Sequence, residues 1–157
     1  MRQWNWKQVF LFVGGTALIG FASNFLSGNT HMVYEMLNKP PLSPPVWLFR
    51  LVWPVLYILI GFAAARVYAS STNRYWRRRG LVLYGGQLVA SFLWPIAFFT
   101  FGFYWLAALV LAVLIIMVVM ASSAFKWVDE LSGKLMTPYI VWLIYALYLN
   151  VGVAIMN

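Results

Sequence analysis

Long apolar runs follow one another along the chain and predict five membrane-spanning helices. An α-helix needs about 20 residues to cross a bilayer, and each run has about that length. The predicted spans cover residues 7–27, 46–69, 80–100, 103–126 and 135–156. The pattern therefore predicts an all-α membrane protein, a bundle of five transmembrane helices.

The segments between the runs are polar or rich in turn-forming residues. The longest, residues 28–45, contains four prolines, whereas only Phe101 and Gly102 separate the third and fourth spans, which should form a tight hairpin. Residues 129–134 form a short polar turn before the fifth span. Spans and connections together use nearly the whole chain, so residues 1–157 are expected to form a single integral membrane domain.

The composition agrees with burial in lipid, because 64% of the residues are hydrophobic and only 9% are charged. The net charge of +8 comes from basic residues placed between apolar runs. This placement is typical of topology signals and headgroup contacts, not of a nucleic-acid surface. The positive-inside rule places the N-terminus, the arginines at 74–79 and residues 129–134 in the cytoplasm. We expect a bacterial cell membrane as the location.

Few side chains are suited to acid–base or nucleophilic chemistry. The chain has no cysteine, and its acidic residues and only histidine all fall in predicted connections: His31, Glu35, Asp129 and Glu130. A lone histidine without a second ligand at helical spacing does not predict a metal site. We therefore expect no metal site and no conventional catalytic centre.

Three spans carry polar and aromatic side chains on one face. Polar groups in a span usually turn toward the bundle interior, because an unsatisfied polar group in hydrocarbon is costly. These stripes contain Trp53 and Tyr57 in the second span, Gln87, Ser91 and Trp94 in the third, and Tyr139, Trp142, Ala146 and Asn150 in the fifth. If the three indoles converge, they form an apolar slot suited to a large planar ligand.

A second interpretation of the aromatic residues is that they mark the headgroup region. It fits the residues near predicted span ends: Trp4, Trp6, Tyr75, Trp76, Trp105 and Trp127. For Trp53, Trp94 and Trp142 both interpretations remain open. Small residues four apart, such as Thr16 with Gly20 and Gly61 with Ala65, predict close helix packing, either within the chain or across a homodimer face.

Short motifs distributed over nearly the whole chain resemble those of the translocator protein family, also called tryptophan-rich sensory proteins. They are the run 34–40 followed by Ser43, Pro44 and Pro45; then Trp47, Trp53, Leu56, Tyr57 and Arg66; then Gln87, Leu93 and Trp94; and finally Pro138, Tyr139, Trp142, Ala146, Leu149 and Asn150. The resemblance implies a five-helix bundle, often a homodimer. It also implies binding of a porphyrin such as protoporphyrin IX or haem, as a ligand and not as a required cofactor.

In some members of that family the ligands include sterols and isoquinoline- or benzodiazepine-type compounds. By motif position, Trp53 and Trp142 resemble the paired indoles of the family's pocket. Tyr34, Pro44, Trp94, Tyr139 and Ala146 correspond to further wall and lid positions, and the long loop would close the mouth. Ser91 stands where many members have asparagine, and its shorter side chain predicts weaker binding of isoquinoline-type ligands.

Three functional hypotheses follow. The first is a porphyrin-binding protein that acts as a sensor or regulator. The second is an enzyme that degrades bound protoporphyrin in light and oxygen, with Trp53 and Trp142 as redox-active or orienting indoles. The third is a transporter of porphyrin or sterol, which the lack of evident internal repeats in the sequence disfavours.

Overall fold

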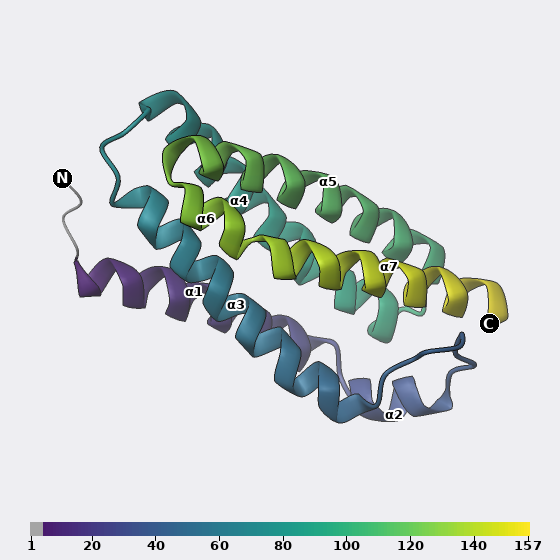
Figure 1. Cartoon of the computed structure of the whole chain (residues 1–157). Helices are drawn as coiled ribbons and strands as arrows, with labels where there is room; N and C mark the ends of the chain where they lie inside the picture. The colour runs from purple at the N-terminus through teal and green to yellow at the C-terminus, as the bar shows by residue number, and fades with distance from the viewer. Residues whose placement is uncertain (1–4) are drawn as a thin grey trace.

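The computed structural model describes residues 5–157, so Arg2 and the predicted interface residue Trp4 lie outside it. Five helical segments in this range are long and apolar enough to cross a membrane, which confirms the predicted fold class. The long helices are α1 (Trp6–Leu26), α3 (Val46–Tyr68), α4 (Arg74–Pro95), α5 (Tyr104–Val128) and α7 (Thr137–Met156). Figure 1 shows them aligned along one long axis.

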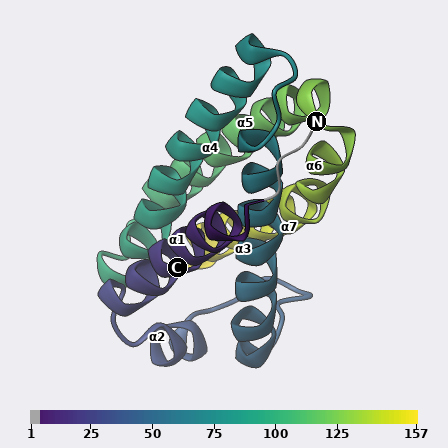
Figure 2. The same cartoon turned by 90° about the vertical axis from the view of Figure 1, so that its left-hand side faces the viewer.

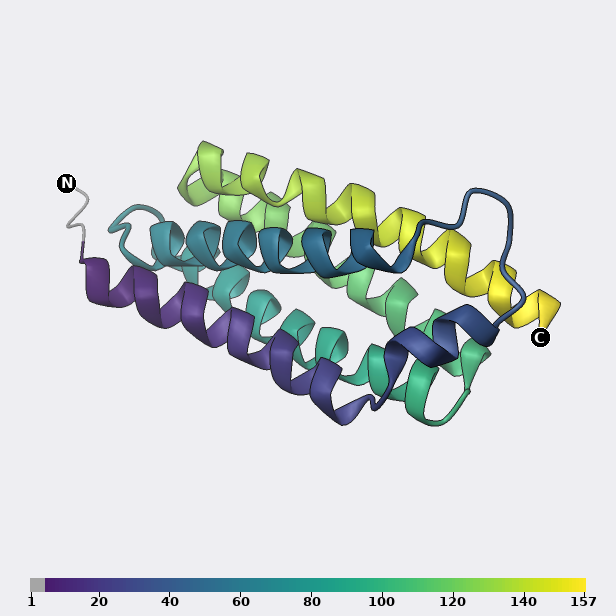
Figure 3. The same cartoon turned by 90° about the horizontal axis from the view of Figure 1, so that it is seen from below.

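The helices pack pairwise, with α4 along α5, α1 along α3, and α7 against α5. Figure 2 shows α4 and α5 together on one side of the bundle, and Figure 3 shows α3 between α1 and α7. One end carries the beginning of α1 and the connection between α3 and α4, and the other carries the C-terminus and the connection between α1 and α3 (Figure 1). The second of these ends contains the site described below.

Two short helices form in segments that the sequence pattern assigned to connections. The long connection contains α2 (Thr30–Met36), and the polar turn at 129–134 folds into α6 (Glu130–Leu135). Side chains cap both helices, because Asn29 accepts from the Met32 N–H at 3.1 Å and Asp129 accepts from the Ser132 N–H at 3.0 Å. Polar residues that look like turn formers in the sequence act here as helix N-caps.

Helix α4 begins at Arg74, whereas the predicted span began at residue 80. The Asn73 side chain caps the helix by accepting from the Trp76 N–H at 3.4 Å. The arginines therefore lie in the first turns of the helix. Apolar length marks the hydrocarbon core, but a helix can continue into the headgroup layer, where charged side chains are solvated.

The hairpin formed by α4 and α5 contains an irregular turn at the end of α4. Pro95 lacks an N–H, and a π-helical turn, η1 (Ile96–Thr100), follows it. Such turns interrupt the regular ladder and often occur at functional sites. Gly102 then adopts a φ of +64°, a left-handed conformation in which glycine meets no steric penalty, so the chain can reverse.

Small residues bring α1 and α3 close together. A Cβ at Gly61 would lie 2.8 Å from the Val13 Cα and 3.0 Å from the Phe12 carbonyl oxygen. Thr16, one helical turn further along α1, forms a buried hydrogen bond with the Tyr84 hydroxyl of α4. Within one chain, these small residues therefore permit close packing of three helices.

An ion pair joins helices at the end that carries the connection between α3 and α4. Arg66 of α3 donates from Nε to Asp129 Oδ2 at 2.8 Å and from Nη2 to Oδ1 at 3.1 Å. Only 12% of each side chain is exposed. The same carboxylate caps α6, so this two-pronged pair fixes α3 relative to the junction of α5 and α6.

Candidate ligand-binding site

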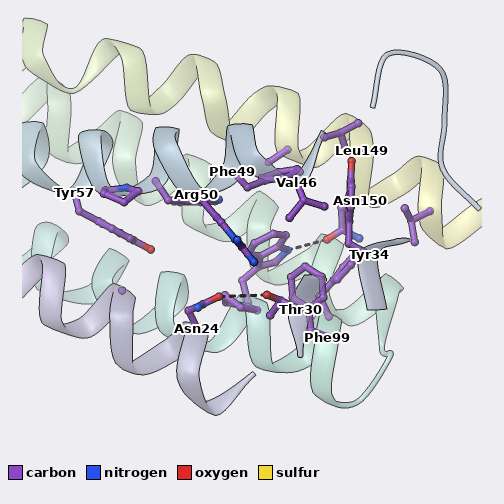
Figure 4. Close-up of a pocket in the computed structure, with 18 of the residues that line it drawn as sticks. Asn24, Thr30, Tyr34, Val46, Phe49, Arg50, Tyr57, Phe99, Leu149 and Asn150 are labelled. Atoms are coloured by element: carbon purple, nitrogen blue, oxygen red, sulfur yellow. Dashed lines mark hydrogen bonds between the residues drawn. The ribbon is translucent and has the colours of Figure 1, made fainter. Parts of the chain in front are cut away.

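A cavity of about 520 Å³ lies between the helices at the end that carries the long connection. Helices α1, α3, α4 and α7 contribute most of its wall, and α2 with the following loop contributes its outer part (Figure 4). This volume falls within the range of small-molecule sites, about 300–1,000 Å³. Aromatic side chains from different elements line it: Phe21, Tyr34, Phe49, Trp53, Tyr57, Trp94, Phe98 and Phe99.

Trp53 is the centre of the aromatic wall. Its ring centroid lies 5.7 Å from that of Tyr57 in a stacked pair and 6.0 Å from that of Trp94. Trp142 meets it edge-on at 6.3 Å, with an interplanar angle of 90°. These separations are typical of favourable aromatic pairs. The three indoles singled out from the sequence therefore do converge within the bundle.

Polar groups are few and come from specific elements. Trp94 Nε1 donates to Asn150 Oδ1 at 2.8 Å, which orients the indole at the cavity wall. On the other side, Thr30 of α2 donates to the Asn24 side chain of α1 at 3.5 Å. Figure 4 shows Arg50 extending from α3 into the cavity toward the region of Asn24 and Thr30. Mostly apolar walls with a few convergent polar groups are typical of a ligand site.

Six of the eleven residues selected from the sequence line this cavity. They come from α2, α3, α4 and α7: Tyr34, Trp53, Tyr57, Trp94, Ala146 and Asn150. The other five lie outside the lining set: Pro44, Gln87, Ser91, Tyr139 and Trp142. Pro44 lines a second, more open depression, the outer depression, which is formed by α2, the loop and the first turns of α3.

Three of those five residues support the wall from behind. Tyr139 and Gln87 are fully buried, and the Tyr139 hydroxyl donates to Gln87 Oε1 at 3.1 Å. Ser91 lies 3.2 Å from the Tyr57 hydroxyl, to which it hydrogen-bonds. These bonds pair the hydroxyls and the Gln87 amide oxygen between α3, α4 and α7. The Gln87 Nε2 group is buried and has no hydrogen-bond partner among residues 5–157.

Trp142 lies on the far side of Trp53 and also contacts Phe49 edge-on at 5.7 Å. Its Nε1–H is buried and has no hydrogen-bond partner among residues 5–157. The indole therefore holds Trp53 and Phe49 in position by ring packing. An unpaired buried donor is unusual and marks this position for testing.

The loop over the cavity is bonded to α7 and to the residue that follows this helix. Tyr148 donates to the Pro41 carbonyl at 2.7 Å, and Tyr145 donates to the Leu42 carbonyl. Asn157 Nδ2 donates to the Asn38 carbonyl at 2.8 Å. Inside the loop, the Tyr34 hydroxyl donates to the Pro44 carbonyl at 2.6 Å, and partial burial raises the pKa of this hydroxyl, so it keeps its proton.

No residue of α1 was predicted to belong to the site, although this helix supplies a whole side of the cavity. Ala17, Gly20, Phe21 and Asn24 line it. Gly20 leaves room for the Tyr57 ring, because an added Cβ would overlap this ring. The small-residue spacing of Thr16 and Gly20 was the only sequence signal for this side. Arg50 also lines the cavity and was not predicted. A charged residue inside a predicted span usually serves a function, so this arginine could have been recognised from the sequence.

Together, five membrane-spanning helices and a docked loop define an integral, multi-pass membrane protein with an internal aromatic cavity. The sequence model of the TspO/MBR family matches residues 10–156. A tryptophan-rich protein TspO from Chlorobaculum tepidum is 35% identical over 149 residues, which cover 94% of each chain. This chain belongs to the TspO/MBR family.

Relatives with other names are similar as well. Protein CrtK from Rhodobacter capsulatus is 36% identical over 126 residues, which cover 79% of this chain and 78% of the relative. The human translocator protein is 30% identical over 139 residues, 82% of this chain and 76% of the relative. The family thus includes proteins named as sensory proteins and proteins named as translocators.

Proposed function

We propose that this protein binds porphyrins and related flat, largely apolar ligands within the membrane and acts as a sensor or regulator. The main support is the cavity of about 520 Å³, whose wall contains the stacked pair of Trp53 and Tyr57. Flat apolar surfaces fit a site that offers several aromatic faces and few hydrogen-bonding groups.

The depth of the site supports a ligand that dissolves in lipid. Trp94, Phe98 and Tyr57 are each less than a tenth exposed, yet they line the cavity. Transfer of a flat hydrophobic ring system from water into such a site removes its apolar surface from water, and each square ångström contributes about 25 cal/mol. Polar ligands of the same size would leave most of their hydrogen-bonding groups unpaired.

The test is a titration of the detergent-purified protein with protoporphyrin IX in the dark, followed by quenching of tryptophan fluorescence. Wild type should show saturable quenching, and Trp53→Phe should bind about tenfold more weakly, since an indole face is lost from the centre of the wall. Trp105→Phe is the matched control, because Trp105 is 61% exposed and lies outside the lining set. Quenching no stronger than that of a free indole in the same detergent would contradict the proposal.

A second candidate function is degradation of the bound porphyrin in light and oxygen. The observation that favours it is the continuous contact of oxidisable rings, since Trp53 lies within 6.5 Å, centroid to centroid, of Trp94, Trp142 and Tyr139. Rings in contact can pass an electron to or from an excited ligand at the wall.

Illumination of the bound complex separates the two candidates. Loss of porphyrin absorbance that requires both light and oxygen, yields a new product and slows in Trp142→Phe would support the enzyme. Absorbance that stays constant under light, with binding intact, would leave a binding protein. Bleaching of equal rate in wild type, Trp53→Phe and Trp142→Phe would exclude these indoles from the reaction.

A further inference from the structure

Arg50 is a charged residue in a membrane-spanning helix. It lies in the second turn of α3 and lines both the aromatic cavity and the outer depression under the loop. A guanidinium in a span is costly unless it reaches polar surroundings or an anion, so intramembrane charges usually serve a function. Figure 4 shows this side chain reaching into the cavity.

The acidic side chains of the chain are engaged with other basic residues. Asp129 pairs with Arg66, and Glu130 pairs with Lys134 at 2.7 Å. Glu35, which lines the outer depression, is 62% exposed and faces His31 at 3.5 Å. Within residues 5–157, no carboxylate thus forms an ion pair with Arg50.

Lys39, the other cationic residue that lines the cavity, already uses its donors. Its ammonium donates to the carbonyl oxygens of Tyr34 at 2.9 Å, Leu37 at 3.2 Å and Glu35 at 3.5 Å. Since an ammonium has three N–H donors, these bonds fold the loop and leave Arg50 as the cationic group that can donate to a ligand in this cavity.

We propose that Arg50 binds a carboxylate on the edge of the ligand and so selects flat apolar molecules that carry an acidic substituent. The inference rests on the proposed function and names its ligand class. A guanidinium presents paired N–H donors that match a carboxylate. The acid would stay at the polar mouth beside Asn24 and Thr30, while the ring system extends inward to Trp53 and Trp94.

The experiment compares protoporphyrin IX, which has two carboxylates, with its uncharged dimethyl ester. Both are titrated into wild type and Arg50→Gln in an uncharged detergent, and the ratio of the two dissociation constants is taken for each protein. The acid and the ester partition differently into the detergent, but this difference is the same for both proteins. It therefore cancels when the two ratios are compared. Arg78→Gln is the matched control, because it removes one positive charge from the exposed first turns of α4.

Wild type and Arg78→Gln should prefer the acid, and Arg50→Gln should lose about tenfold of that preference while it binds the ester normally. Arg50→Lys should recover part of it, since charge is kept and the paired donors are lost. An equal ratio in wild type and Arg50→Gln, with both ligands bound, would overturn the inference and leave the proposed function intact. Failure of every protein to bind either compound would instead overturn the proposed function.

An anionic lipid headgroup offers the same chemistry as the ligand acid. The titrations are therefore repeated with phosphatidylglycerol added to the micelles. If Arg50 serves the ligand, the lipid should lower acid affinity only by competition at high concentration. A preference for phosphatidylglycerol that Arg50→Gln abolishes, with no change in the ratio of acid to ester, would assign Arg50 to lipid and overturn the inference.

Discussion

Trp94 and Asn150 form a buried hydrogen bond that joins α4 to α7 at the cavity wall, with 2.8 Å between Nε1 and Oδ1. The Asn150 amide nitrogen donates in turn to the Tyr104 carbonyl of α5, also at 2.8 Å. One side chain thus holds three helices, and its exposed fraction is 1%. The position of the Trp94 indole in the site therefore depends on Asn150.

Asn150→Ala should lower the free energy of unfolding by about 2 kcal/mol, because it leaves the buried Trp94 N–H unpaired and removes the bond to the Tyr104 carbonyl. Unfolding of the detergent-solubilised protein, followed by circular dichroism, measures this. Trp94→Phe combined with Asn150→Ala should cost less than the sum of the single changes, since both remove the same bond. Strict additivity would show that the bond contributes nothing to stability.

The bonds between the loop and α7 should control how fast a ligand enters and leaves. Tyr145→Phe with Tyr148→Phe removes two donors to the loop carbonyls but keeps both rings. Association and dissociation of protoporphyrin IX, measured by stopped-flow quenching, should both accelerate several-fold, since loop opening gates such sites. The ratio of the rates should change less.

Tyr75→Phe provides the control for this pair, since Tyr75 is 61% exposed on α4 and bonds only to Arg79 among the residues described. It should leave both rates unchanged. Rates in the double variant equal to those of wild type would mean that the ligand reaches the cavity by a route that avoids the loop.

Arg66→Gln should destabilise the bundle by about 3 kcal/mol, because it leaves the largely buried Asp129 carboxylate without its paired guanidinium. Lys134→Gln breaks a pair whose side chains are 63% and 71% exposed, and stability should hardly change. Circular dichroism in detergent compares the two. Equal and small losses would show that the Arg66 pair is as well solvated as the exposed one.

The sequence pattern predicted the fold well because lipid imposes strong constraints on length and polarity. Every backbone group must be satisfied within a span, so apolar runs of the right length can only be helices here. The pattern predicted neither α2 nor α6. Their formation depends on Asn29 and Asp129 as N-caps, and short polar helices leave no hydrophobic period to detect.

The site was predicted only in part, for two physical reasons. Periodicity assigns polar residues to the bundle interior but cannot separate those that face a cavity from those that bond to each other, as Tyr139 and Gln87 do. Periodicity also cannot identify a position that shapes the wall because it lacks a side chain. Gly20 shapes the α1 side because it leaves room for the Tyr57 ring, and a glycine in an apolar run gives no polar signal.

If the aromatic cavity holds the ligand, a side chain that fills the cavity from α1 should displace it. A side chain at Gly20 would meet the Tyr57 ring, whereas a Cβ at Gly14 of the same helix meets no atom within 4 Å. Gly20→Leu and Gly14→Leu thus add the same atoms to one helix, one into the cavity and one away from it. Circular dichroism first establishes that both variants are folded.

Titration with protoporphyrin IX in the dark then gives the affinity of wild type and both variants. We expect Gly14→Leu to bind as wild type does and Gly20→Leu to bind at least about tenfold more weakly, a loss of about 1.4 kcal/mol. Equal affinities in all three folded proteins would contradict the account, because the ligand would then bind somewhere other than this cavity.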